Sequence, residues 1–346
     1  MISVDPNGRL KNLRELHGMT QKQFAAELDI GQAQLSQIES GQRNLTEATM
    51  SAARYRFGVG PSFFQEEAIR YDATDLNYRT RKLSARERRI ANVSFGLTEQ
   101  VVRARNARAT AAPSLGITRE DTILPRREIE AYAADARSMI GVPLYKVINN
   151  VTRCIERAGV LVTGLDLPAN SHLVDGISTP RHTDEPFVMT LDLDKSGDRL
   201  RFSGAHEFGH ILMHTDHRPT SDSTRESEAD MFAGAFLLPR EPMLDELSPG
   251  LTLTGYTRVK ARWGVSVQAI IRRALDLRVI DQDRYRSLFI QLSSRGWRTE
   301  EPVEIPREKP AISTPRLLRP AVRPERPAGL GSASNVIPLF GGPEES

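Results

Sequence analysis

The feature that most constrains this fold is His206-Glu207-Phe208-Gly209-His210, an H-E-x-x-H pattern within a run of helical character. Residues four apart lie on one face of a helix, with Cβ atoms about 5–6 Å apart. Two imidazoles placed in this way can reach one metal ion, at about 2.0–2.1 Å from nitrogen to zinc. Glu207 follows the first of them and is placed to take a proton from water that the metal activates. The alternative is a surface helix that carries two unrelated histidines.

Residues 225–239 predict a second helix, with an acidic start and an apolar face. Two histidines leave a catalytic zinc one protein ligand short, and a carboxylate commonly completes the set, so Glu226 is the candidate. Asp230 lies four residues later on the same face, where it could hold a ligand imidazole by its second ring nitrogen. Glu228 is the competing ligand, less well placed because Phe232 follows it at the same spacing. Acids also simply favour the positive end of a helix, but this does not explain their phasing against an apolar stripe.

Together, H-E-F-G-H and the run E-x-E-A-D-x-F-A-x-x-F-L-L-P resemble the ImmA/IrrE family of bacterial metallopeptidases, over roughly residues 125–245. The resemblance implies a zincin-like fold and a zinc ion (Zn2+) held by two histidines and one glutamate. It also implies that the glutamate of H-E-x-x-H is the general base. On this chain the ligands would be His206, His210 and Glu226, and the base Glu207. Gly234 departs from the family pattern, which has a larger residue there.

His214 is a further histidine near this motif, eight residues after His206. On a straight helix eight residues span about 12 Å along the axis. His214 therefore cannot share one metal ion with the other two histidines, and we expect it to have a structural or substrate-facing role.

The N-terminal residues 8–58 predict a compact helical module. Leu10, Leu13 and Leu16 form one apolar face, and Thr20 is placed to cap the next helix. Two short helices follow, across a tight turn, which is typical of a helix-turn-helix. The motifs M-T-Q-x-x-F-A-x-x-L and Q-A-Q-L-S-Q-I-E-S-G-Q-R resemble the Xre/phage-repressor family over about fifty residues, which implies DNA binding.

The third helix of this module, residues 32–39, has an inner and an outer face. Leu35 and Ile38 point inward. Glutamine can form two hydrogen bonds with adenine in the major groove, and a methyl side chain can meet thymine. The expected base-reading residues are Gln32, Ala33, Gln34 and Gln37, and the expected phosphate contacts are Gln21 and Arg43. A helical bundle used only for protein contact is the alternative.

Composition sets limits on the function. A chain of 346 residues allows two or three domains, and its net charge of +3 permits nucleic-acid binding without arguing for it. Cys154 is the only cysteine, which excludes a disulfide framework and fits a reducing cytoplasm. No apolar run approaches the roughly 20 residues that span a bilayer, and the N-terminus shows no secretion signal. We therefore expect a cytoplasmic protein without a membrane partner.

The predicted fold class is α+β and mainly helical, with five parts. They are a lambda-repressor-like helix-turn-helix domain (1–62), a basic linker and long helix (63–124), a zincin-like domain with a small sheet (125–245), a helical, helix-turn-helix-like subdomain (246–300) and a Pro-rich disordered tail (301–346). The long helix should run over about residues 84–108, with Ser84 as its cap. It either adds phosphate contacts or packs between domains.

Within the zincin-like domain, helices are expected at 127–140 and 143–157, and strands at 159–167, 173–178 and 186–193. The third strand is the candidate edge for pairing with an extended substrate, although it could equally be a central strand. After Pro239, helices are expected at 254–263, 266–277 and 281–293.

These patterns predict a DNA-binding regulator, acting as a homodimer on double-stranded operator DNA, with a zinc-dependent endopeptidase domain. The resemblance implies that the protein substrate is a repressor or antitoxin, cleaved in a stress or prophage response. One alternative is a regulator whose zincin domain is a sensor that cuts nothing. Another is the antitoxin of a toxin–antitoxin pair.

Overall fold

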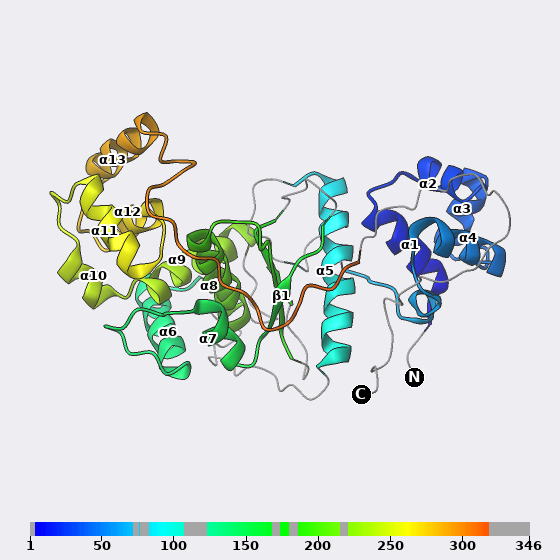
Figure 1. Cartoon of the computed structure of the whole chain (residues 1–346), viewed down its shortest axis with the longest axis horizontal. Coiled ribbons are helices and arrows are strands. Elements are labelled where there is room, and N and C mark those ends of the chain that lie inside the picture. The colour runs from blue at the N-terminus through cyan, green and yellow to red at the C-terminus, as the bar shows by residue number, and fades with distance from the viewer. Residues whose placement is uncertain are drawn as a thin grey trace.

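The computed structural model describes residues 4–71, 76, 83–106, 123–167, 174–179, 186–214 and 221–317. Its elements form successive layers along one long axis (Figure 1). A small helical domain stands at one end, followed by one long helix, a three-stranded sheet, and the helices of the C-terminal half. The structure confirms the predicted class, α+β and mainly helical. Within the described residues, no helix is both long and apolar enough to span a bilayer.

The N-terminal domain consists of four helices and a short 3-10 helix: α1 (Pro6–Leu16), α2 (Gln21–Glu27), α3 (Gln32–Glu39), α4 (Glu47–Phe57) and η1 (Pro61–Gln65). The predicted apolar face of α1 is confirmed, since Leu10, Leu13 and Leu16 are all buried. Thr20 is confirmed as the cap of α2, where it forms a reciprocal capping box with Gln23. The shared core, which includes Phe24 of α2 and Leu35 and Ile38 of α3, holds the two helices in the helix-turn-helix arrangement.

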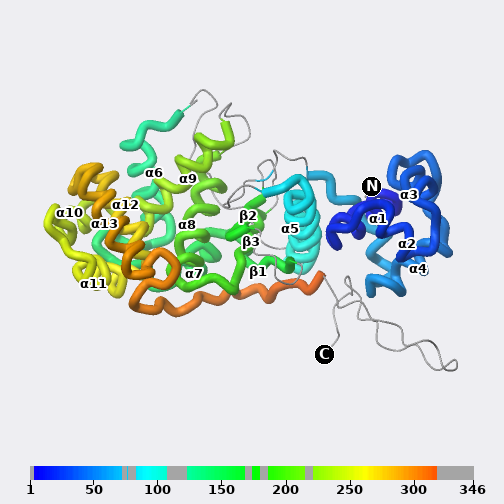
Figure 2. Tube along the Cα trace, turned by 90° about the horizontal axis from the view of Figure 1, so that it is seen from above, coloured from blue at the N-terminus to red at the C-terminus, as the bar shows by residue number. Residues whose placement is uncertain are grey.

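The long helix α5 (Ala85–Arg105) lies between the N-terminal domain and the three-stranded sheet (Figure 2). Its predicted cap, Ser84, is confirmed by a capping box with Glu87. One face of α5 places Val93 and Leu97 in the core of the N-terminal domain. Another face places Phe95 in a cluster with residues of the sheet. The helix therefore packs between domains, which is the second of its two expected roles.

The sheet contains β1 (Leu161–Gly164), β2 (Gly176–Ser178) and β3 (Val188–Leu191), in the order β1-β3-β2. β1 pairs with β3 in parallel and β2 pairs with β3 antiparallel. β3 is thus central, and the prediction that it offers a free edge to substrate is wrong. Every residue of β3 is buried, as expected for a strand with a neighbour on both sides.

Helices α6 (Arg126–Met139), α7 (Val151–Arg157), α8 (Gly197–Met213) and α9 (Asp222–Leu237) build the main core on the side of the sheet that faces away from α5 (Figure 1). The prediction of a helix over 143–157 is wrong before Val151, because the Asn150 side chain accepts from Arg153 N and starts the helix there. α8 and α9 lie very close together. A Cβ at Gly209 would stand 2.8 Å from Phe232 Cδ1, so only glycine allows this approach.

The remaining helices are α10 (Arg240–Glu246), α11 (Leu253–Trp263), α12 (Val267–Asp276) and α13 (Gln282–Ser294). α10 was not predicted, whereas the other three agree with the sequence expectation to within a residue or so. Their apolar residues belong to the same continuous core as α6 to α9, with Trp263 and Ile270 fully buried in it. This region is therefore a packed extension of the domain that carries α8.

The chain after α13 differs from its prediction. Residues 301–317, here called the C-terminal strap, form an extended segment that runs back past α8 and β1 towards α5 (Figures 1 and 2). The prediction of a disordered tail is therefore wrong for these residues, and residues 318–346 lie outside the described part. The strap ends at Leu317, which is buried in the core of the N-terminal domain.

Two glutamates anchor the strap, although its composition offers little apolar surface. Glu308 accepts from the backbone amides of Val151 and Thr152, which open α7, and pairs with Arg201 at 2.5 Å. Glu301 does the same at the start of α12, where it also meets Lys260. Carboxylates at the positive ends of helices, each beside a buried cation, explain why the strap is ordered.

Candidate metal centre

The two histidines of the H-E-x-x-H pattern lie on one face of α8, in the interior of the molecule. His206 and His210 have 0% and 2% of their surface exposed. Their rings stand edge to face, and the two Nε2 atoms are 3.0 Å apart. The helix therefore directs both nitrogens to one point, as the spacing predicted.

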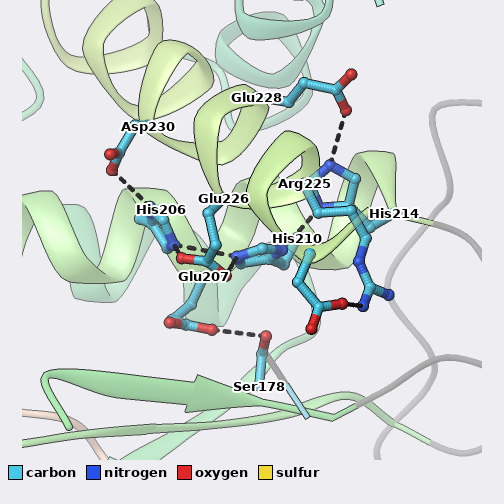
Figure 3. Close-up of polar contacts among 10 residues, drawn as sticks. Ser178, His206, Glu207, His210, His214, Arg225, Glu226, Glu228 and Asp230 are labelled. Atoms are coloured by element: carbon cyan, nitrogen blue, oxygen red, sulfur yellow. Dashed lines mark hydrogen bonds and ion pairs between the residues drawn. The ribbon is translucent and has the colours of Figure 1, made fainter. Parts of the chain in front are cut away.

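Helix α9 supplies the third group at this point. Ser221 caps α9, and the first turns of the helix cross α8 at the level of the histidines (Figure 3). Glu226 Oε2 lies 3.3 Å from His206 Nε2, and Oε1 lies 3.2 Å from His210 Nε2. The structure thus brings His206, His210 and Glu226 together, and their donor atoms all lie within 4.8 Å of one another.

These separations fit one small divalent cation. Two donors at about 2.0–2.1 Å from zinc and at a tetrahedral angle lie about 3.3 Å apart. The three separations in the structure, 3.0, 3.2 and 3.3 Å, fall close to that value. Two imidazoles and a carboxylate are also the donor types that a catalytic zinc site uses, with a further position left for water or substrate.

The electrostatics of the three groups favour a cation. Burial lowers the pKa of His210 to about 3, so this ring stays neutral. Burial also opposes a charge on His206, but hydrogen bonds to Asp230 and Glu226 outweigh it and raise its pKa to about 9. Burial would raise the pKa of Glu226, yet hydrogen bonds from both imidazoles hold it well below its usual range. The Glu226 carboxylate therefore remains charged between the two imidazoles, and a neutral His210 ring keeps a lone pair available for a cation.

Glu207 points from α8 towards the sheet and is fully buried. Its Oε2 accepts a hydrogen bond of 2.8 Å from Ser178 Oγ on β2. Gly176, also on β2, makes room for it, because a Cβ there would lie 2.9 Å from Glu207 Cγ. The edge strand therefore holds this carboxylate beside the histidines, and the part of Ser178 had no signal in the sequence.

The two other acids of α9 take different positions. Asp230 Oδ1 lies 2.9 Å from His206 Nδ1, on the far side of that ring from Glu226. Glu228 points away from the three donor atoms and is buried against α8, with Oε1 accepting from Leu124 N. Of the two acids considered as ligands, the structure places Glu226 and not Glu228 at the point where the histidines converge.

His214 lies closer to this centre than its distance along the helix suggested. It ends α8, and its side chain is 1% exposed. Its Nδ1 is 2.7 Å from His210 Nδ1, and its Nε2 is 3.1 Å from Glu228 Oε2. The spacing of four residues between His210 and His214 places the two rings on one face of α8, and this is the sequence signal for their contact.

The predicted DNA-reading residues gather on the outer face of α3. Gln32, Ala33 and Gln37 are exposed and Gln34 is partly exposed, while Leu35 and Ile38 are buried, as predicted. A recognition helix enters the major groove with an exposed face, so this arrangement of α3 suits DNA binding.

The two expected phosphate contacts differ. Arg43 is exposed, and its carbonyl accepts from Asn7 Nδ2, which fixes the loop after α3. Gln21 is half-buried and donates from Nε2 to Glu39 Oε2 at 2.9 Å, and Glu39 also pairs with Arg14. Gln21 thus joins the two helices of the motif in this structure.

Fold and site define a protein with a helix-turn-helix module for DNA and a metallopeptidase-like domain with a His-His-Glu cluster. Comparison with protein families agrees on both parts. Residues 10–64 match the helix-turn-helix family, and residues 155–275 match the IrrE N-terminal-like domain of peptidase family M78. The matches confirm the predicted fusion of an Xre-like helix-turn-helix with an ImmA/IrrE-like domain. A search among curated proteins found no match.

Proposed function

We propose that this protein is a DNA-binding transcriptional regulator whose zinc-dependent endopeptidase domain cleaves a partner protein. The observation that carries the proposal is the convergence of His206, His210 and Glu226 within 4.8 Å, beside the buried carboxylate of Glu207. The family match over residues 155–275 supports metal-dependent peptide chemistry at this place.

In this proposal His206, His210 and Glu226 hold Zn2+, and Asp230 orients the ring of His206 through Nδ1. A bound zinc ion would polarise the scissile carbonyl and acidify water. Glu207 takes the proton from the attacking water and then delivers it to the leaving amine. Ser178 donates to Glu207 Oε2, which fixes the orientation of this carboxylate beside the histidines.

The helix-turn-helix domain binds operator DNA and so gives the protein its role as a transcriptional regulator. Gln32, Ala33, Gln34 and Gln37 read base edges in the major groove of an operator, with Arg43 on a phosphate. The protein acts as a homodimer in the cytoplasm, where a palindromic operator presents two half-sites one helical turn apart. The substrate is a repressor or an antitoxin, cleaved in response to stress or prophage induction.

The experiment compares the wild type with Glu207→Gln. Both proteins are assayed for bound zinc and operator binding, then expressed in the native cell under DNA-damage and prophage-inducing stress, with proteome-wide detection of new protein termini. Fragments that appear with the wild type and vanish with Glu207→Gln, with metal retained in both, are the expected result and would name the substrate. Identical fragment patterns would overturn the peptidase and leave a regulator with a sensory metal site.

A further inference from the structure

The two histidines of the centre use their Nε2 atoms to face Glu226, so their Nδ1 atoms face outwards (Figure 3). Each outward nitrogen has a partner. His206 Nδ1 meets Asp230 directly, whereas His210 Nδ1 meets another imidazole, that of His214, at 2.7 Å. Each nitrogen of a neutral imidazole can be either the donor or the acceptor. The ring of His214 can therefore accept from His210 in a defined way only if a further partner fixes its tautomer.

Glu228 supplies that arrangement. Its Oε2 lies 3.1 Å from His214 Nε2, and its Oε1 accepts from the backbone amide of Leu124 at 2.9 Å. The side chains of His214 and Glu228 are each only 1% exposed. A carboxylate buried to this degree requires hydrogen bonds to offset the loss of water, and the ring of His214 is one of its donors.

We propose that Glu228 and His214 form a positioning relay for His210, an inference that rests on the metal centre of the proposed function. Neutral His210 that offers Nε2 to a cation carries its proton on Nδ1 and donates it to Nδ1 of His214. His214 then carries its proton on Nε2 and donates it to the carboxylate of Glu228. The chain of donors fixes one tautomer for both rings and makes His210 a stronger electron donor.

The relay gives each ligand imidazole its own carboxylate from α9. Asp230 serves His206 without an intermediate, and its side chain is 59% exposed. Glu228 serves His210 through His214, entirely within the core. A purely structural role for Glu228, that of joining Leu124 to α9, predicts a loss of stability on substitution but no change in the affinity of a folded protein for metal.

The test measures the affinity of the full-length protein for Zn2+ by competition with a chromogenic chelator, and needs no substrate. His214→Phe keeps the shape of a ring but removes both nitrogens, and we expect it to bind zinc about 10- to 100-fold more weakly. His214→Gln offers one acceptor and one donor and should recover most of the affinity. Glu228→Gln should weaken zinc binding about tenfold, because the amide places an NH2 donor at one of the two positions where a carboxylate oxygen now accepts.

Glu308→Gln is the matched control, since it makes the same change to a buried, ion-paired glutamate away from the centre. It should leave zinc affinity unchanged, which shows that lost stability alone does not weaken the site. Wild-type affinity in folded His214→Phe, or in folded Glu228→Gln should His214→Phe not fold, would overturn the relay. If the affinities follow the expected order but no cellular protein is cleaved, the relay stands and the peptidase proposal fails alone.

Discussion

The two functional regions of this chain differ in how their residues are held. On α3, the side chains expected to meet DNA are exposed or half-exposed, on a helix whose inner face is buried. At the centre on α8 the opposite holds, since His206, Glu207 and His210 are buried and each is hydrogen-bonded to a neighbour. The outer face of α3 presents exposed side chains to a large partner. The buried side chains on α8 are instead fixed by their neighbours around the position where a metal ion would bind.

Substitutions should therefore have different effects in the two regions. An exposed reader contributes to binding but hardly to folding, and well-separated contacts add up. A buried, mutually bonded group contributes to both, and effects within such a network do not add.

The largest effect is expected for Glu226→Gln. This substitution removes the carboxylate that faces both His206 and His210, and an amide oxygen is a poor ligand for zinc. We expect the affinity for Zn2+ to fall about a thousandfold, because one of three protein ligands is lost. Metal content after dialysis and chelator competition measure this, and operator affinity should stay at the wild-type value.

Glu241→Gln, on the exposed surface of α10, is the control for Glu226→Gln and should keep its metal. The competing ligand, Glu228, provides the decisive comparison. Glu228→Gln should still bind one zinc per chain, with weaker affinity. Loss of stoichiometric zinc from Glu228→Gln, with zinc intact in Glu226→Gln, would show that the ligand was assigned to the wrong glutamate.

The main features of both regions could be predicted from the sequence because they depend on local periodicity. The i, i+4 spacing of His206 and His210 sets their common face, and the inward pattern of Leu35 and Ile38 identifies the outer face of α3 by elimination. The capping residues Thr20 and Ser84 were equally local signals.

What the sequence did not reveal depends on packing between distant segments. The contact of Ser178 with Glu207 requires β2 to lie beside α8, and 29 residues separate the two side chains. The central place of β3 follows from pairing on both sides, which no single strand encodes. The strap was mistaken for disorder because Glu308 gains its stabilising partners 156 and 157 residues earlier in the chain.

The exposed region gives the second prediction. Gln37→Ala removes a side chain that points out from α3, and loss of a base contact costs about 1–3 kcal/mol. Operator affinity should therefore fall about 10- to 100-fold, while the midpoint of thermal unfolding and the zinc content stay unchanged. Fluorescence anisotropy with labelled operator at fixed salt measures the affinity.

The control for Gln37→Ala is Gln65→Ala, an exposed glutamine on η1 that is not part of the outer face of α3. It should bind the operator as the wild type does. Equal affinity of Gln37→Ala and the wild type would remove this residue from the reader and would favour a domain used for protein contact.

The third prediction separates stability from function within the buried half. Glu308→Gln weakens the bond to Arg201 and to the two backbone amides that open α7. Because the new amide still offers one acceptor oxygen, the expected loss is about 1–3 kcal/mol in the free energy of unfolding. Urea denaturation measures it, and neither zinc affinity nor operator affinity should change. Unaltered stability would mean that the strap contributes little to the fold.

The smallest effect is expected for Asp230→Asn, which tests the contrast inside the centre itself. Asp230 and Glu228 each support one ligand imidazole, but the side chain of Asp230 is 59% exposed and that of Glu228 is 1% exposed. Water screens and can replace an exposed hydrogen-bond acceptor, whereas nothing replaces a buried one. Asp230→Asn also keeps an oxygen that can accept from His206 Nδ1. Zinc affinity should therefore fall only a few-fold, less than for Glu228→Gln, in the same chelator competition. A larger loss for Asp230→Asn than for Glu228→Gln would mean that direct contact with a ligand ring, and not burial, decides how much a supporting carboxylate contributes.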